Sequence, residues 1–211
     1  MQLIGMLDSP FVRRVAISLQ LLKLPFSHRS VSVFSAFDVF RAINPVVKSP
    51  SLICDDGTVL MDSSLILDYA ETLAHPRSLM PKTINERQQV LRIIGLAMAA
   101  NEKSVQLYYE SQRPADKQYD HWQQRVYGQL TAAYDQLEQI LATTPLAVDR
   151  TITQAGVTVA VAWYFTQHII PGTIDPKHYP QLVGFSHLAE QLPEFMAAPY
   201  GDSEYQAGYL Y

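Results

Sequence analysis

The sequence predicts an α/β domain with the element order βαβαββα, followed by an all-α domain. Over residues 1–75, short apolar runs alternate with stripes of apolar residues at helical spacing. A segment with two prolines and no periodicity follows at residues 76–84. Beyond it no convincing strand pattern appears, and long stretches repeat apolar residues at the spacing of amphipathic helices. We therefore expect residues 76–84 to link the two domains.

Each element of the first domain has its own pattern. Apolar residues recur from Val12 to Leu19 at positions i, i+3, i+4 and i+7, which predicts a helix that Pro25 must end. Gly57 follows an aspartate between two apolar runs, and an Asp-Gly pair supplies the positive φ angles of a tight hairpin turn. The predicted strands are residues 2–6, 26–33, 51–54 and 58–61, and the predicted helices are residues 11–22, 36–43 and 63–73.

The second domain, residues 85–211, is predicted to be helical throughout. Residues 153–168 are apolar on most faces, which is typical of a helix buried on all sides. Thr153 is expected to cap this helix. The tail from Pro199 is rich in Gly and Tyr and has no assignable pattern. The predicted helices are residues 85–112, 116–142, 153–168 and 180–195.

Composition excludes several classes of function. Sixteen Lys and Arg against twenty Asp and Glu give a net charge of −4, which argues against a broad nucleic-acid-binding surface. The one cysteine, Cys54, excludes a disulfide framework, a CxxC pair and a multi-cysteine zinc site, and the histidines show no metal-binding spacing. No signal-peptide pattern or membrane-spanning apolar run is visible. We expect a cytoplasmic protein with no metal and no membrane partner.

Two strand-to-helix junctions carry hydroxyl groups that could bind a ligand. Helix N-termini present unpaired N–H groups and a positive dipole end, so the hydroxyl of Ser9 can face a ligand anion there. At the second junction, Ser63 could bind a carboxylate and Asp62 an ammonium group. The alternative for both junctions is helix capping, with Pro10 as a first-turn proline.

A third candidate is the loop that enters the third predicted strand. A cis peptide bond between Ser49 and Pro50 would turn the backbone N–H and C=O of Ser49 outward to pair with an extended ligand. The alternative is an ordinary trans turn proline. Lys48, beside them, is either a ligand-binding group or a solvated loop charge.

Taken in order, three motifs resemble the cytosolic glutathione transferase family, and most of all its bacterial serine-type members. The motifs are Ser-Pro-Phe-x-Arg-Arg-Val from Ser9, Asn-Pro-x-x-Lys-x-Pro-x-Leu from Asn44, and Asp-Ser-x-x-Ile from Asp62. The resemblance covers nearly the whole chain. It implies a thioredoxin-like first domain that binds glutathione as co-substrate, with no prosthetic group, and a helical domain that lines a pocket for the electrophile.

The resemblance also implies roles for individual residues. Ser9 would contact the glutathione sulfur and act as the catalytic residue. Ser49, which precedes Pro50, would pair with the cysteinyl backbone of glutathione. Asp62 and Ser63 would hold the γ-glutamyl end, and Lys48 would lie near the glycyl carboxylate. The electrophile pocket would include Leu7, Tyr108 and Tyr109, although an aromatic pair at this spacing is also typical of a helix core. Arg13 and Arg14 are expected to be structural, and Cys54 to be an apolar filler. Family members are usually two-fold dimers, so a homodimer is expected.

Two departures from the family pattern bear on the reaction and on helix stability. Leu7 and Asp8 replace part of the Ser-Ser-x-Ser run of the isomerase branch, which disfavours maleylacetoacetate-type isomerisation. Gly156 stands where the family has the Asp of a capping box after Thr153.

We therefore expect an enzyme that activates the glutathione thiol for attack on a small hydrophobic electrophile. The alternative is a non-catalytic glutathione-binding or protein-interaction module with the same fold, since fold alone does not establish activity. A glutathione-dependent disulfide reductase is disfavoured, because Ser9 stands where such a protein would carry a thiol.

Overall fold

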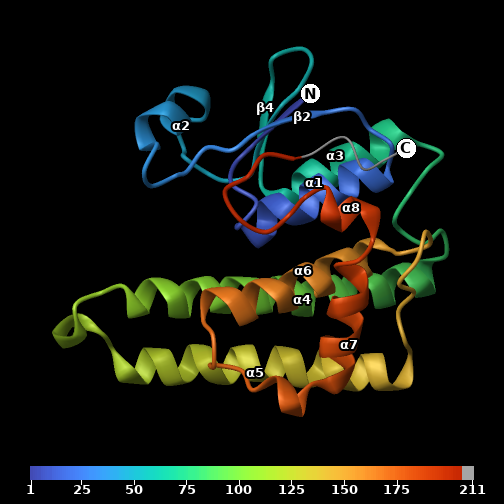
Figure 1. Ribbon diagram of the computed structural model, residues 1–211. Helices are drawn as coiled ribbons and strands as arrows, with labels where there is room; N and C mark the ends of the chain where they lie inside the picture. The colour runs from blue at the N-terminus through green and yellow to red at the C-terminus, as the bar shows by residue number, and fades with distance from the viewer. Residues whose placement is uncertain (206–211) are drawn as a thin grey trace. The chain divides into compact units, whose positions relative to one another are not determined.

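The computed structural model describes residues 1–205, which form two units. The first unit comprises residues 1–79 together with residues 191–205, and the second comprises residues 80–190. Figure 1 shows that all strands of this described part of the chain belong to the first unit, and that the second is built from helices. The predicted fold class, an α/β domain followed by an all-helical region, is confirmed.

A mixed sheet forms the centre of the first unit. Within residues 1–205 it has four strands in the order β2-β1-β3-β4. These are β1 (Gln2–Ile4), β2 (Ser27–Arg29), β3 (Ser51–Ile53) and β4 (Val59–Met61). The β1–β2 pair is parallel and the other two pairs are antiparallel. A parallel pair needs a crossover, which α1 (Pro10–Leu21) supplies. All four strands lie inside the predicted ranges but are shorter than predicted.

Helices pack on the sheet because its side chains alternate between its faces. Ile4 forms a buried cluster with Phe40 of α2 (Phe37–Ile43). The preceding Leu3 points to the opposite face and is fully buried. Figure 1 shows α1 and α3 (Ser63–Ala74) side by side along one side of the strands, and the two helices are in contact. The helices of this unit therefore follow the predicted order.

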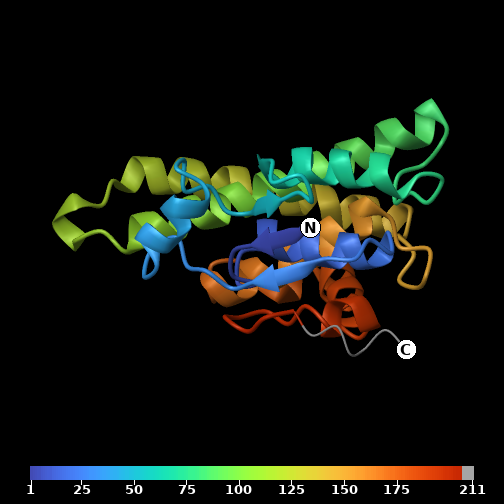
Figure 2. The same cartoon turned by 90° about the horizontal axis from the view of Figure 1, so that it is seen from above.

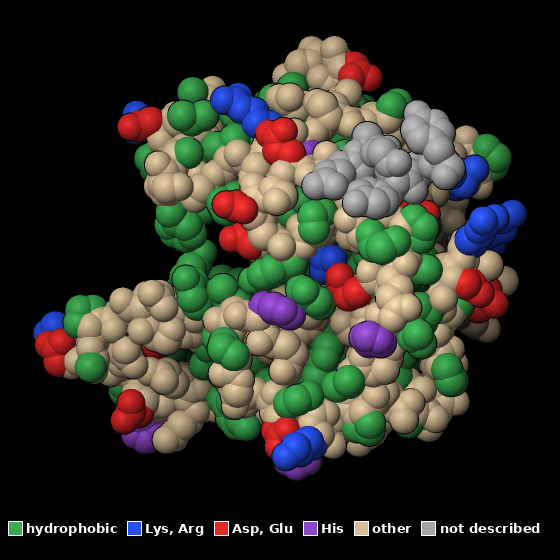
Figure 3. All heavy atoms as spheres, viewed as in Figure 1, with side chains coloured by type: hydrophobic (Ala, Val, Ile, Leu, Met, Phe, Trp, Pro, Cys, Tyr) green, Lys and Arg blue, Asp and Glu red, His purple; other side chains and the backbone are tan. Residues whose placement is uncertain are grey.

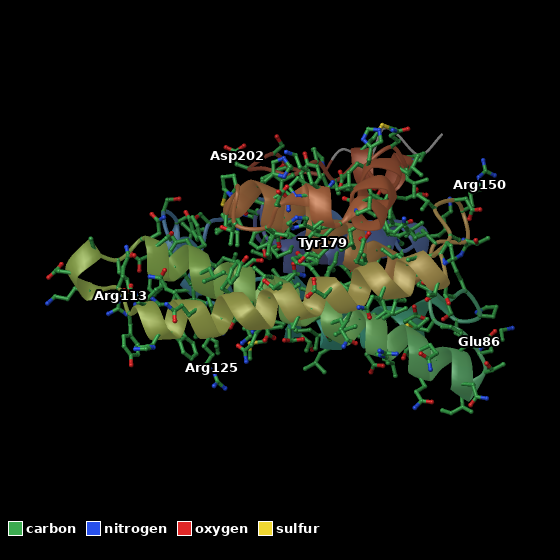
Figure 4. All side chains as sticks on the ribbon, turned by 90° about the horizontal axis from the view of Figure 1, so that it is seen from below. Glu86, Arg113, Arg125, Arg150, Tyr179 and Asp202 are labelled. Atoms are coloured by element: carbon green, nitrogen blue, oxygen red, sulfur yellow. The ribbon has the colours of Figure 1, made fainter. Side chains whose placement is uncertain are left out.

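The second unit is built around the apolar helix α6 (Gln154–Ile169), which contacts α4 (Ile84–Ser111) and α7 (Pro180–Ala189). Figure 2 shows α4 running alongside α5 (Asp120–Thr143), with which it is in contact. Tyr179 lies among these helices, whereas Arg113 and Arg125 point outward (Figure 4). The buried environment predicted for α6 is therefore observed.

Two predicted helix boundaries are wrong. The predicted helix at residues 180–195 is two helices, α7 and α8 (Pro193–Met196). Proline lacks the N–H that a helix interior requires, so Pro193 begins a new helix instead of continuing α7. In α5, the predicted start at residue 116 falls within a short 3-10 helix, η1 (Ala115–Lys117), and the α-helix begins at Asp120.

The cap expected from Thr153 is also absent. Thr153 occupies the N-cap position of α6, but its side chain makes no capping hydrogen bond. In the same turn, the side chain of Ile152 packs against Gly156. A Cβ added to Gly156 would lie only 2.7 Å from the Ile152 Cγ1 atom. A side chain at position 156, such as the Asp of a capping box, would therefore displace Ile152.

The surface described within residues 1–205 has mixed charge. On the face drawn in Figure 3, basic side chains are scattered among acidic ones. In this part of the chain, no helix combines the length and the apolar character needed to cross a membrane. It also contains no group of three or more His, Cys, Asp and Glu side chains that could hold a metal ion.

The end of the described chain belongs to the first unit, whereas the sequence assigned it to the helical domain. Two buried polar side chains of α1 hold it there. Arg13 Nε donates to the carbonyl of Ala198 at 2.8 Å, and Gln20 Nε2 donates to the carbonyl of Glu194 at 3.0 Å. Further along, the Tyr205 ring stacks on Phe26 with 4.6 Å between ring centroids. Residues 191–205 therefore form a tail bound to the first unit.

His28 of β2 joins this tail to β1. The backbone N–H of Tyr205 donates to His28 Nδ1 at 3.0 Å, so we assign the ring proton to Nε2, which donates to the carbonyl of Gly5 at 2.7 Å. Burial lowers the pKa of His28, and the Gly5 carbonyl and Glu204 oppose that shift. The bridge requires the neutral imidazole, because a protonated Nδ1 cannot accept from Tyr205.

The pH dependence of stability tests this bridge. The pKa of His28 is lower in the folded state than the ordinary value of about 6.5. Its contribution is therefore complete above about pH 6.5 and is lost as the pH falls toward the folded-state pKa, by at most about 1.4 kcal/mol per pH unit for one proton. We expect His28→Gln to flatten the slope of unfolding free energy between pH 7.5 and 5, measured by urea titration.

The control is His121→Gln, because His121 is exposed in the second unit. It should leave the slope unchanged. An equal slope in the wild type and in His28→Gln would contradict the bridge.

Candidate functional site

The N-terminus of α1 presents Ser9 at the end of the β1–α1 loop. Ser9 is the N-cap, and Pro10 occupies the first helical turn, as predicted for a capped helix. The Val12 N–H donates to Ser9 Oγ at 3.5 Å, a long and therefore weak hydrogen bond. Since Ser9 only accepts in this bond, its hydroxyl proton stays available for another acceptor. Ser9 is half-buried, so this hydroxyl can be reached from outside.

The loop before β3 contains a cis peptide bond between Ser49 and Pro50. The Asn44 side chain holds this loop in place through two hydrogen bonds. Its Oδ1 accepts from the Val46 N–H at 3.0 Å, and its Nδ2 donates to Ser51 Oγ at 2.8 Å. Ser51 Oγ in turn donates to the carbonyl of Lys48 at 2.8 Å. The sequence indicated Asn44 as the end of a helix and the start of the second family motif, but not as the residue that holds the loop, although Asn side chains commonly bond to the backbone in turns.

Gly5 brings this loop against the first turn of α1. Its φ of +135° is rarely adopted by residues with a side chain. A Cβ added to Gly5 would lie 2.3 Å from Ser49 Oγ and 2.7 Å from Val12 Cγ2. The glycine therefore allows close approach between the β1 end, the Ser49 loop and the helix that Ser9 caps.

The N-terminus of α3 carries Asp62 and Ser63. Asp62 is the N-cap, with φ 72° and ψ 123°, a conformation that costs an aspartate about 1–3 kcal/mol and is typical of functional sites. Its Oδ1 accepts from the Ser64 N–H at 2.9 Å, and its Oδ2 lies 3.9 Å from Lys48 Nζ. Both side chains of this ion pair are about half exposed, so it adds little stability but places Lys48 beside Asp62.

Arg14 connects α1 to the same end of α3. Its side chain is 2% exposed, and its Nη1 donates to Ser63 Oγ at 3.0 Å and to Ser64 Oγ at 3.2 Å. Burial lowers the pKa of Arg14 to about 10, and Asp62 opposes the shift. The guanidinium therefore stays charged at neutral pH. The sequence predicted a structural role through packing and salt links; the observed partners are two hydroxyls at a predicted binding position.

Asp8 adds an acidic group next to Ser9. Burial raises its pKa, a hydrogen bond from the Ser9 N–H opposes this, and Asp202 of the tail raises it further. The sequence showed Asp8 only as a departure from the isomerase pattern. Its proximity to Asp202 depends on the fold, because nearly the whole chain separates the two residues.

The three residues predicted for the electrophile pocket fall in different units. Leu7 is fully buried in the first unit. Tyr108 and Tyr109 lie near the end of α4 in the second unit, with 5.8 Å between their ring centroids, and Tyr109 is 48% exposed. Cys54 is buried, which agrees with its expected place as a core residue.

The second unit contains a separate cavity of about 340 Å³, open to solvent. It lies where the C-terminal half of α4 meets the first half of α5 and the end of α6. Its lining is apolar with amide and hydroxyl groups, and consists of Leu107, Ser111, Gln123, Gln124, Tyr127, Ile170 and Thr173.

The predicted glutathione-binding residues therefore lie close together in the first unit. The contacts at Gly5 join the Ser49 loop to α1, Arg14 joins α1 to Ser63, and Lys48 joins the loop to Asp62. The result is a rim of hydroxyl, backbone and charged groups around two helix N-termini. Such a rim suits a small, extended ligand that carries both carboxylate and ammonium groups.

The first unit matches a known domain family, and the chain as a whole has known relatives. Residues 3–78 match the family model "Glutathione S-transferase, N-terminal domain". The GST-like protein YibF of Escherichia coli (strain K12) is 27% identical over 186 residues, which cover 87% of this chain and 92% of YibF.

Solved structures are similar to this chain in fold. A glutathione S-transferase from Methylobacterium radiotolerans, in complex with glutathione sulfonate, matches with a TM-score of 0.87 and 22% identity, covering 96% of both chains. A glutathione transferase family member from Pseudomonas fluorescens Pf-5, with bound S-(propanoic acid)-glutathione, matches with a TM-score of 0.76 and 26% identity, covering 94% of this chain and 98% of the other.

The close approach at Gly5 gives a stability prediction. Gly5→Ala should lower the free energy of unfolding, because it combines an unfavourable φ with a steric clash. Gly57→Ala is the matched control, since Gly57 has φ +86° and nothing within 4 Å of an added Cβ. We expect Gly5→Ala to cost about 1–3 kcal/mol more than the control, measured by urea unfolding. Equal losses would show that the packing at Gly5 is not tight.

Proposed function

We propose that this chain is a member of the glutathione transferase family, and that its first unit binds glutathione and activates the thiol for attack on a small hydrophobic electrophile. The observation that carries the proposal is the contact network that joins Ser9, Ser49 and Ser63 through Gly5 and Arg14. The glutathione derivatives bound in the structural relatives support it.

The rim offers a distinct partner for each part of glutathione. The γ-glutamyl ammonium group pairs with Asp62, and its carboxylate with the hydroxyl and N–H of Ser63. The backbone of Ser49, before Pro50, pairs with the cysteinyl residue. Lys48 takes the glycyl carboxylate. Asp62 and Lys48 lie 3.9 Å apart in the structure, so ligand binding would exchange one exposed ion pair for two contacts of opposite charge.

Thiol activation follows from the position of Ser9. A free thiol has a pKa of about 8.5 and is mostly protonated at pH 7. A hydrogen bond to a charged acceptor contributes about 1.5–3 kcal/mol, and each pKa unit corresponds to about 1.36 kcal/mol. One donor from Ser9 would therefore lower the thiol pKa by about one to two units. The N-terminus of α1 acts in the same direction.

The electrophile pocket is assigned to Leu7, Tyr108 and Tyr109 on the basis of the family resemblance. The alternative function is a glutathione-binding module without turnover. The thiol pKa of bound glutathione separates the two, because an enzyme needs a lowered pKa and a module does not.

We also propose a homodimer, which exposed apolar side chains support. On α3, Leu65 is 65% exposed, and Leu73 is also exposed. On α4, Ile84 is 78% exposed, and Leu91 is also exposed. On each helix, exposed large apolar side chains are typical of a surface covered by a second copy.

Ser9→Ala tests thiol activation. We expect the pKa of bound glutathione to rise by about one to two units while its affinity changes by only a few-fold, because the hydroxyl contacts the sulfur and not the rest of the tripeptide. Thiolate absorbance against pH measures this. An unchanged pKa in the variant would remove the role assigned to Ser9, and an unshifted pKa in the wild type would favour the module.

Sedimentation at micromolar concentration tests the dimer. The wild type should sediment at twice the chain mass of 23.8 kDa, and Leu65→Glu should shift it toward the single-chain mass, because a buried unpaired charge opposes association. Leu188→Glu, at an exposed leucine of α7, is the control and should remain dimeric. A wild-type species near 24 kDa would contradict the proposal.

A further inference from the structure

The buried guanidinium of Arg14 contacts the N-terminus of α3, where we place the γ-glutamyl end of glutathione. Arg14 is 2% exposed, and Nη1 bonds to the hydroxyls of Ser63 and Ser64 at 3.0 and 3.2 Å. Ser63 is itself buried, and Ser64 is exposed. A side chain that carries charge is rarely found so deeply buried unless it has a specific function or partner.

The direction of these hydrogen bonds fixes the serine hydroxyls. A guanidinium group only donates, so Ser63 Oγ and Ser64 Oγ must accept from Arg14. Each hydroxyl keeps its own proton for a second partner. At Ser63, this proton is available to a ligand atom at the N-terminus of α3, and a carboxylate oxygen is the strongest acceptor that such a donor can meet.

The charge of Arg14 acts in the same direction. The N-terminus of a helix carries a partial positive charge. The Arg14 guanidinium, bonded to the first two residues of α3, adds to this positive charge. Buried charges are screened less than exposed ones, so the charge of Arg14 adds to the attraction for an anion there. Asp62, the N-cap residue that precedes Ser63, supplies a negative charge for an ammonium group. The two charges therefore suit the two ends of an α-amino acid headgroup.

We propose that Arg14 is a positioning residue that selects ligands with a free α-carboxylate at the γ-glutamyl end, by holding Ser63 as a hydrogen-bond donor. It acts through Ser63 and does not touch the ligand. This inference rests on the proposed glutathione site and adds its headgroup specificity. A tripeptide in which 4-aminobutyrate replaces the γ-glutamyl residue keeps the ammonium group and lacks only the carboxylate, so it isolates the contribution of Arg14.

Calorimetric titration with two ligands tests the proposal. The ligands are S-methylglutathione and the matching S-methyl tripeptide with 4-aminobutyrate. We expect the wild type to bind S-methylglutathione at least about 10-fold more tightly than the 4-aminobutyrate ligand. This ratio of the two affinities corresponds to about 1.4 kcal/mol. Arg14→Met should remove most of this ratio and leave the affinity for the second ligand within about three-fold. Arg14→Lys keeps the charge and should retain part of the ratio.

Two further variants keep the test decisive. Arg13→Met removes the neighbouring buried arginine, which bonds to the Ala198 carbonyl, so it should lower stability without changing the ratio. Ser63→Ala keeps Arg14 and should remove the ratio as Arg14→Met does, and the double variant should lose no more than either single one. If Arg14→Met does not fold, Arg14→Lys decides the question, because a full wild-type ratio in this variant would overturn the role of Arg14.

The outcomes separate the two proposals. If the wild type binds neither ligand, the glutathione site itself is wrong, and this inference falls with it. If the wild type prefers S-methylglutathione but Arg14→Met and Arg14→Lys keep the full ratio, the glutathione site stands and the role of Arg14 is wrong. If Arg14→Met lost affinity for both ligands by the same factor, that role would also be overturned, because the result would show only general damage to the fold.

Discussion

The polar side chains on the buried helix α1 hold the first unit together. Arg14 reaches the serine hydroxyls at the start of α3, while Arg13 and Gln20 bind carbonyls of the tail. All three side chains are nearly inaccessible to solvent. A buried polar group that loses its partner costs about 1–3 kcal/mol, and more when it is charged. The helix is thereby fixed relative to α3 and the tail, and the proposed glutathione site depends on this fixed placement.

The placement of the proposed glutathione site depends on how α1 is fixed. With α1 fixed, its N-terminus presents the Ser9 hydroxyl, which makes only one long hydrogen bond to the helix. Gly5 allows the Ser49 loop to approach the same turn, and Asn44 holds the loop in place. The groups proposed to bind glutathione thus lie on three separate segments, each held by a buried hydrogen bond or a close contact. Such preorganisation reduces the entropy that ligand binding must overcome.

Local patterns predicted the elements and the candidate positions. The apolar stripe of α1, the Asp-Gly hairpin turn and the apolar helix α6 all lie where the sequence indicated. Long-range partners could not be predicted. Nothing near Arg14 in the sequence indicates that it meets Ser63, 49 positions later, and the tail that meets His28 is 177 positions away. The missing cap at Thr153 was also not predicted, because the residue type at an N-cap position does not determine which way its side chain turns.

The central claim is that glutathione binds along the rim formed by the Ser49 loop and the N-terminus of α3. Titration of the ¹⁵N-labelled protein with S-methylglutathione, followed through its backbone amide resonances, tests this most directly. The account predicts saturable shifts that are largest at the amides of Ser49, Ser63 and Ser64, since these N–H groups lie at the rim. Shifts that are absent there, or that are confined to residues 80–190, would contradict it.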